Sequence, residues 1–189
     1  MKTTDFLQKA KKYIIYANIL PKGQHRLYTT PLMIQYTVNT MRFVLMSRIT
    51  YDEQEMILYD YGGKEPYITI DYSEIKKVGV FATARIVNTG HLPGQQFHVV
   101  LRIICDQGDF EIETCDEDHA LQILHYIHSR DIPIVDPYKI VKIMMMTKDE
   151  NHGFYNYMIK HFTEMAKTYG LENPTIDITR KARKFNKQE

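Results

Sequence analysis

The sequence predicts an α+β protein: a seven-stranded antiparallel barrel capped by a helix, with an N-terminal helix and a C-terminal helical pair. Apolar residues follow a helical period up to about residue 20, a strand-like period of two to about residue 115, and a helical period beyond it. Most turns between the strand segments are short enough for hairpins. A hydrophobic content of 44% and a charged content of 25% in 189 residues are typical of a chain that buries an apolar core.

Several bulk properties predict a cytoplasmic protein. The longest apolar run, YIIYANIL, is far too short to span a bilayer, and the N-terminus lacks the apolar core of a secretory signal. Cys105 and Cys115 lack the CxxC spacing of a redox or metal-binding pair. The expected strand register also places the two thiols on opposite faces of the sheet, so we expect them to stay reduced.

Charge is unevenly distributed along the chain, although the net charge is +1. Residues 1–26 contain six basic residues and one acidic residue, and residues 180–189 contain five basic residues and one acidic residue. The body between them is therefore acidic. A dedicated nucleic-acid-binding domain needs a basic face on the fold itself, so this distribution argues against one. The basic ends remain able to contact the acidic body or an acidic partner.

The first element that we expect is a helix over residues 3–20. Thr3 or Thr4 is a suitable N-terminal cap, and the PKG sequence at 21–23 ends the helical pattern. The apolar face of this helix is formed by Phe6, Ala10, Tyr13, Ile14 and Ala17. Together with a linker, the helix makes up the first predicted segment, residues 1–27.

Seven strands are expected after this helix. They are rich in Val, Ile, Tyr, Phe and Thr, which favour a pleated sheet. The turns YDEQE, GGKE and DQGD have hairpin length and favour an antiparallel meander. A longer loop, NTGHLPGQQ, covers residues 88–96. The predicted strands cover residues 31–38, 42–51, 55–61, 66–71, 76–87, 97–105 and 110–115.

The last hairpin has two different faces. If Asp106 pairs with Asp109 across the DQGD turn, Glu111 and Glu113 lie on a solvated face beside Arg102. The opposite, apolar face includes Leu101, Ile103, Cys105, Phe110 and Ile112.

A helix follows this hairpin directly. Thr114 and Glu117 have the spacing of a capping box, and the acids at 116–118 suit the positive end of a helix. We expect the apolar stripe of this helix to lie on the barrel. The stripe is formed by Ala120, Ile123, Leu124 and Ile127.

Three stretches carry a resemblance to a known family: ITIDYSEIKKVGV, FHVVLRIICDQGDFEIET and DEDHALQILHYIHSRDIPI. Together with seven strands and one closing helix, they resemble the bacterial pleckstrin-homology-like (PH and GRAM-type) domains over residues 28–135. The resemblance implies a PH-like barrel. Some members bind inositol phosphates through basic residues near the first hairpins. The matching turn here, YDEQE, is acidic and departs from that pattern, which weakens the expectation of headgroup binding. Another small antiparallel barrel or sandwich with a packed helix is the alternative fold.

The remaining chain is predicted to be helical up to a basic tail. Residues 136–148 and 151–170 each have helical periodicity, Pro137 suits a first turn, and Gly170 suits a helix end. These helices make up the predicted pair at 136–172, and residues 173–189 form the tail. The pair brings so many apolar residues to a small barrel that we also expect self-association, unless the N-terminal helix covers the same surface.

Two sets of residues are candidates for binding. Methionine and aromatic side chains of the helical pair are typical of adaptable interfaces, although core packing is the alternative interpretation. This partner-binding set is Met144, Met145, Phe154, Met158, Phe162 and Met165. The basic tail is a candidate for binding nucleic acid or an anionic membrane, although a solubilising tail is the alternative. This anion-binding set is Arg180, Lys181, Arg183 and Lys184.

The motifs that mark catalytic or cofactor sites are absent from the sequence. His119, His125 and His128 lie on one predicted helix but lack the further ligands of a zinc site, so we expect solvated histidines and no metal. No GxSxG, HExxH, Walker or GxGxxG pattern occurs, so no cofactor is expected. An enzyme with a site near the 88–96 loop is the third hypothesis, after the two binding functions.

We therefore predict a non-catalytic interaction module that binds another protein through a barrel edge or through the Met-rich C-terminal helices. The alternative is peripheral binding to an anionic membrane or to nucleic acid through the basic termini.

Overall fold

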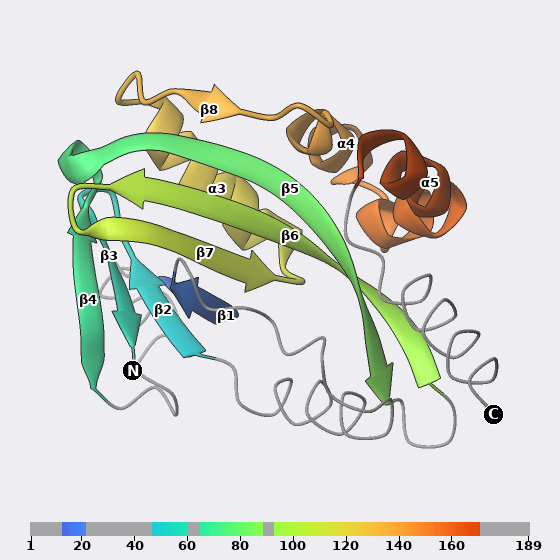
Figure 1. Ribbon diagram of the computed structural model, residues 1–189, viewed down its shortest axis with the longest axis horizontal. Coiled ribbons are helices and arrows are strands. Elements are labelled where there is room, and N and C mark those ends of the chain that lie inside the picture. The colour runs from blue at the N-terminus through green and yellow to red at the C-terminus, as the bar shows by residue number, and fades with distance from the viewer. Residues whose placement is uncertain (1–12, 22–46, 60–64, 89–92, 171–189) are drawn as a thin grey trace, which may run out of the picture.

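The computed structural model describes residues 13–21, 47–59, 65–88 and 93–170. These ranges form an α+β fold in which an antiparallel sheet is covered by helices (Figure 1). The strands are β1 (Tyr13–Pro21), β2 (Ser47–Tyr51), β3 (Glu55–Tyr59), β4 (Pro66–Asp71), β5 (Ile75–Asn88), β6 (Pro93–Cys105), β7 (Gly108–Thr114) and β8 (Ile134–Val135). The helices are a 3₁₀ turn (Tyr72–Glu74), α3 (Glu117–His128), α4 (Ile140–Thr147) and α5 (Gly153–Tyr169).

The sheet is open, with the strand order β4-β3-β2-β1-β7-β6-β5-β8. Strand β1 connects the two halves of the sheet. Its residues 13–17 pair with β2 in one half, and its residues 18–21 pair with β7 in the other. Figure 1 shows β2, β3 and β4 running steeply across the direction of β5, β6 and β7.

The prediction of a closed seven-stranded barrel is therefore wrong. Closure would require β4 to pair with β5. In the described part of the chain these two strands do not pair: β4 is one edge of the sheet, β5 lies near the other edge, and the 3₁₀ turn connects them. The short strand β8 lies instead on the outer edge of β5, in parallel pairing of Ile134 with Val78. The Val78 N–H donates to the Pro133 carbonyl at 2.9 Å, so part of this edge is already occupied.

The predicted N-terminal helix is also wrong over residues 13–20, which lie within strand β1. The segment YIIYANILP contains the β-branched and aromatic residues that favour strands, and it pairs with two neighbours. These tertiary contacts override the local helical periodicity, because helix propensity is a weak preference, and the segment forms a strand. The first twelve residues of the chain lie outside the described ranges.

Most other strands agree with the prediction. Strand β4 has the predicted bounds, and β3, β5, β6 and β7 overlap the predicted segments, while the predicted strand at 31–38 lies outside the described residues. In the last hairpin Cys105 pairs with Gly108, so the two-residue turn lies at 106–107, one residue earlier than expected. A register shift of two residues keeps each side chain on its predicted face.

Helix α3 covers the inner face of the sheet, as its apolar stripe predicted. Ala120, Ile123, Leu124 and Ile127 are buried. Asp116, not Thr114, is the N-terminal cap, and its side chain accepts the N–H of His119 at 3.1 Å.

Both ends of α3 are fastened to the β2–β4 half of the sheet. At its start, the Tyr51 hydroxyl lies 2.5 Å from Nδ1 of His119. Just beyond its end, Arg130 donates to the carbonyl of Glu53, and its guanidinium lies 5.0 Å from the centre of the Tyr72 ring. His119 is therefore a structural contact rather than the solvated histidine that was expected.

Helices α4 and α5 pack beside β5 and β6 (Figure 1). Helix α4 begins at Ile140, later than predicted, because the Asp136 carboxylate accepts the N–H groups of Ile140 and Val141, each at 2.8 Å. Helix α5 ends at Gly170, as predicted, and this glycine has a left-handed backbone with φ 66°. None of the helices in the described ranges is both long and apolar enough to cross a bilayer.

Candidate binding cleft

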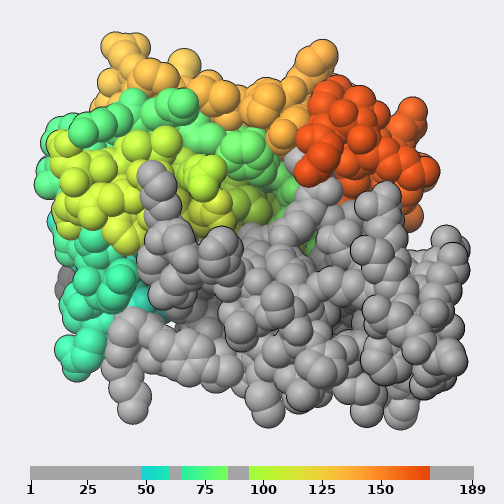
Figure 2. All heavy atoms as spheres, in the orientation of Figure 1, coloured from blue at the N-terminus to red at the C-terminus, as the bar shows by residue number. Residues whose placement is uncertain are grey.

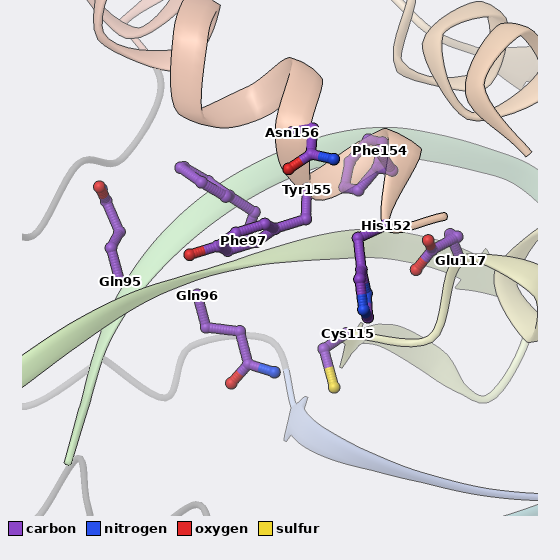
Figure 3. A pocket seen from close by; sticks show the side chains of 9 residues that line it. All are labelled: Gln95, Gln96, Phe97, Cys115, Glu117, His152, Phe154, Tyr155 and Asn156. Carbon is purple, nitrogen blue, oxygen red and sulfur yellow. The ribbon is translucent and has the colours of Figure 1, made fainter. Parts of the chain in front are cut away.

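A cleft of about 550 Å³ lies where three separate segments of the chain meet (Figure 3). The segments are the start of β6, the turn between β7 and α3, and the start of α5. The described residues that line the cleft are Gln95, Gln96, Phe97, Cys115, Glu117, His152, Phe154, Tyr155 and Asn156.

The junction between α4 and α5 sets the position of one wall. His152 has a left-handed backbone with φ 54°, which turns the chain sharply before α5 begins. At Gly153 a Cβ atom would lie 2.1 Å from the Thr147 carbonyl oxygen, so a larger residue would not fit against the end of α4. This close approach fixes the direction in which Phe154 and Tyr155 leave the helix start.

Aromatic rings form the apolar part of the cleft. Phe97 is buried, and its ring centre lies 5.2 Å from that of Phe162 and 5.7 Å from that of Tyr155. Tyr155 is the outer ring of this stack and is 38% exposed. Figure 3 shows the Phe97 and Tyr155 rings side by side in the wall of the cleft. The contact with Phe162 ties the wall to the hydrophobic core.

The polar part of the cleft consists of amides, the Cys115 thiol, the Glu117 carboxylate and the His152 imidazole. Burial raises the pKa of Glu117, and the neighbouring carboxylates of Asp118 and Asp116 raise it further. Burial also raises the pKa of the Cys115 thiol, and the negative charges of the nearby acids raise this pKa further. Cys115 therefore remains a protonated thiol at neutral pH, which is the opposite of what a nucleophilic cysteine requires.

The described ranges contain no group of three or more His, Cys, Asp and Glu side chains arranged to hold a metal ion.

The structure separates the predicted partner-binding set into two groups. Met144, Phe154, Met158 and Phe162 are buried in the core, which is the alternative interpretation given to this set. Met145 is exposed and Met165 is half-buried. Because one chain already buries most of the stripe, its apolar residues do not require a second copy to cover them.

The predicted anion-binding set, Arg180, Lys181, Arg183 and Lys184, lies outside the described residues. The sequence-based hypothesis of a site near the 88–96 loop comes closest to the cleft, because Gln95 and Gln96 line it. Cys115, Glu117 and His152 were missed as site residues. No sequence pattern connects them, since the cleft depends on three segments that are distant along the chain.

Comparison with protein-family models, curated proteins and solved structures finds no match.

Proposed function

We propose that this chain is a non-catalytic protein-binding module, and that a peptide segment of the partner lies in the cleft beside α5. The observation that carries the proposal is the combination of a concave cleft that has an aromatic wall with exposed apolar residues along its border. Sites for ligands and partners commonly combine an apolar concavity with a few polar groups that orient what is bound.

Exposed apolar residues continue from the cleft along α5. Tyr155 lines the cleft, and Ile159, one turn further along the same face, is 53% exposed. In Figure 2, α5 stands at one end of the described part of the molecule, accessible from that side. Contiguous exposed apolar surface next to a cleft is typical of an interaction site.

Two other surfaces fit the binding routes expected from the sequence. Among the strands that the structure describes, β4 is at an edge of the sheet, which suits strand addition, and Tyr67 on it is 56% exposed. The outer face of α4 presents Met145 and Met146, of which Met146 is 59% exposed. The cleft is favoured because it offers depth and polar orienting groups as well as exposed apolar area.

Several properties remain predictions alongside this proposal: the absence of catalysis, the cytoplasmic location and the resemblance to PH and GRAM-type domains. The second candidate function, binding to an anionic membrane or nucleic acid, rests on the five basic residues within 180–189. It predicts contacts from the tail rather than from α5.

Site-specific photo-crosslinking tests the proposal. Benzoylphenylalanine placed at Ile159, Tyr67 or Met146 samples the cleft border, the sheet edge and the α4 face at nearly equal exposure: 53%, 56% and 59%. In a native lysate we expect a defined protein adduct from position 159. Tyr155→Ala should abolish this adduct and Tyr67→Ala should not. Adducts from position 67 or 146 alone, or no protein adduct at any position, would overturn the proposal.

A further inference from the structure

Acidic residues occur in or next to two of the segments that form the cleft. Asp116, Glu117 and Asp118 surround the start of α3, and Asp149 and Glu150 precede α5. These two acidic segments are far apart in sequence. Glu117 lines the cleft, and Asp149 and Glu150 lie three and two residues before His152, which also lines it. His152 is the single basic side chain among the described lining residues.

Most of these acids are not neutralised within the described part of the chain. The Asp116 carboxylate caps α3 and lies 3.7 Å from Nε2 of His119. The ion pairs found among the described residues do not include Glu117, Asp118, Asp149 or Glu150. Carboxylates held close together repel one another, and a bound cation relieves that repulsion.

The aromatic wall suits the same kind of ligand. A guanidinium or ammonium group is attracted to the face of an aromatic ring. This chain already uses such contacts, because the Arg48 guanidinium lies 3.9 Å from the centre of the Tyr59 ring and Arg130 lies over Tyr72. In the cleft, the partly exposed Tyr155 ring and the carboxylate of Glu117 lie on either side of His152 (Figure 3), so a peptide that crosses the cleft can reach both.

From these features we infer that the partner segment bound in the cleft is basic: a Lys/Arg-containing peptide that places an apolar side chain against Phe97 and Tyr155 and its cationic groups against Glu117 and the neighbouring acids. The inference rests on the proposed function and names the chemistry of the partner. Nucleic acids and anionic lipid headgroups carry the same sign of charge as this cleft, so electrostatic repulsion disfavours them here.

A fluorescence-anisotropy titration of the full chain tests the inference. The probe is a fluorescein-labelled peptide, Gly-Arg-Lys-Phe-Arg-Lys-Gly, with two matched peptides in which Gln or Glu replaces every Arg and Lys. We expect the basic peptide to bind and the Glu peptide not to bind. Raising NaCl from about 50 to about 300 mM should weaken binding, because screening acts on charge-driven contacts.

The protein variants locate the site. Glu117→Gln should weaken binding of the basic peptide about fivefold, which is the order expected for one partly buried charged contact. Glu164→Gln removes an exposed acid in the second half of α5 and should leave the affinity unchanged. Thermal melting of both variants confirms that the fold is retained. Because the pKa of Glu117 is raised, lowering the pH should weaken binding at a higher pH than for an ordinary glutamate.

The outcomes separate this inference from the proposed function. Equal binding of the basic peptide to wild type and Glu117→Gln, or equal binding of the Glu peptide, overturns the inference. So does binding of oligouridine or phosphatidylserine vesicles that is lost on Tyr155→Ala. If the segment crosslinked from position 159 proves acidic or neutral, the protein-binding function stands and the basic chemistry fails. If no adduct forms at that position, both fail.

Discussion

Two acid–base pairs on the same outer face of the β6–β7 hairpin differ mainly in their access to water. Arg102 and Glu111 pair directly across the strands, with Nε and Oε1 3.5 Å apart and side chains 44% and 30% exposed. Further from the turn, His98 Nδ1 lies 2.9 Å from Glu113 Oε1, and these side chains are 3% and 0% exposed.

The comparison indicates that position along a hairpin decides how much an acid–base pair contributes to stability. An exposed pair is screened by water and typically contributes about 0–1 kcal/mol. For a buried pair the desolvation of each polar group is large, so removing one partner costs about 3–5 kcal/mol even where the intact pair adds little net stability. The expectation that Glu113 lies on a solvated face is therefore wrong, while Glu111 fits it in part.

The surroundings of the two pairs explain the difference. Thr83, which pairs with His98 across β5 and β6, is buried, and so is Val100 opposite Glu113. The hairpin is thus buried on both faces at this end. At the turn end, the outer face presents Arg102 to solvent. Alternation of polar and apolar residues cannot report such a change along one strand, because a strand buried on both faces loses the alternation.

The largest expected effect comes from breaking the buried pair. Glu113→Ala removes the carboxylate that His98 faces and should lower the free energy of unfolding by about 3–5 kcal/mol. Urea denaturation followed by circular dichroism measures this change. A loss below about 1 kcal/mol would contradict the burial argument. The double variant His98→Leu with Glu113→Met should regain a large part of the loss, since replacing both polar groups removes the desolvation penalty.

Leu124 of α3 allows the effect of breaking the buried pair to be compared with the loss of a buried apolar side chain. Leu124 is buried between the helix and the sheet. Leu124→Ala should destabilise the protein by about 2–5 kcal/mol, because it loses transfer free energy and leaves a cavity. Ile159→Ala on the exposed side of α5 is the matched control and should change stability by less than about 0.5 kcal/mol. If both variants unfold at the same urea concentration as wild type, α3 is not docked as described.

An intermediate effect is expected at the start of α3, where one partner is buried and the other is partly exposed. Tyr51→Phe removes the hydroxyl that lies 2.5 Å from His119 but keeps the buried ring. Stability should fall by about 0.5–1.5 kcal/mol, the usual range for one hydrogen bond. Thermal melting checks this, with Tyr67→Phe on the exposed strand β4 as the control that should not shift the midpoint.

The smallest effect belongs to the exposed pair. Glu111→Gln should change the free energy of unfolding by less than about 1 kcal/mol, and added salt should reduce the difference further. The same urea titrations at low and high NaCl give the measurement. A loss similar to that of Glu113→Ala would mean that exposure does not distinguish the two pairs.

Local sequence patterns predicted the parts of the fold that depend on local physics. The bounds of β4, the buried stripe of α3 and the left-handed end of α5 at Gly170 all follow from residues within a few positions of one another. The same patterns failed for β1, because YIIYANILP is compatible with either a helix or a strand until β2 and β7 pair with it. The parallel pairing of β8 with β5 left no local signal either.

The candidate cleft could not be predicted for a related reason. Each wall is ordinary when taken alone: a strand start, a residue before a helix cap and the first turn of a helix. A common cleft forms only when the folded sheet and α5 bring three segments together: residues 95–97, 115–117 and 152–156. The hypothesis of a site near the 88–96 loop included one wall, but it had no means of finding the other two.

Residue pattern alone is enough to locate the apolar segments, the buried face of α3 and the end of α5, because periodicity and capping act over one or two turns. Tertiary structure alone decided that the sheet stays open, that Glu113 is buried beside His98 and that Glu117 shares a cleft with His152. These outcomes depend on contacts between residues tens of positions apart. Their free energies arise from pairing, desolvation and packing that exist only in the folded chain.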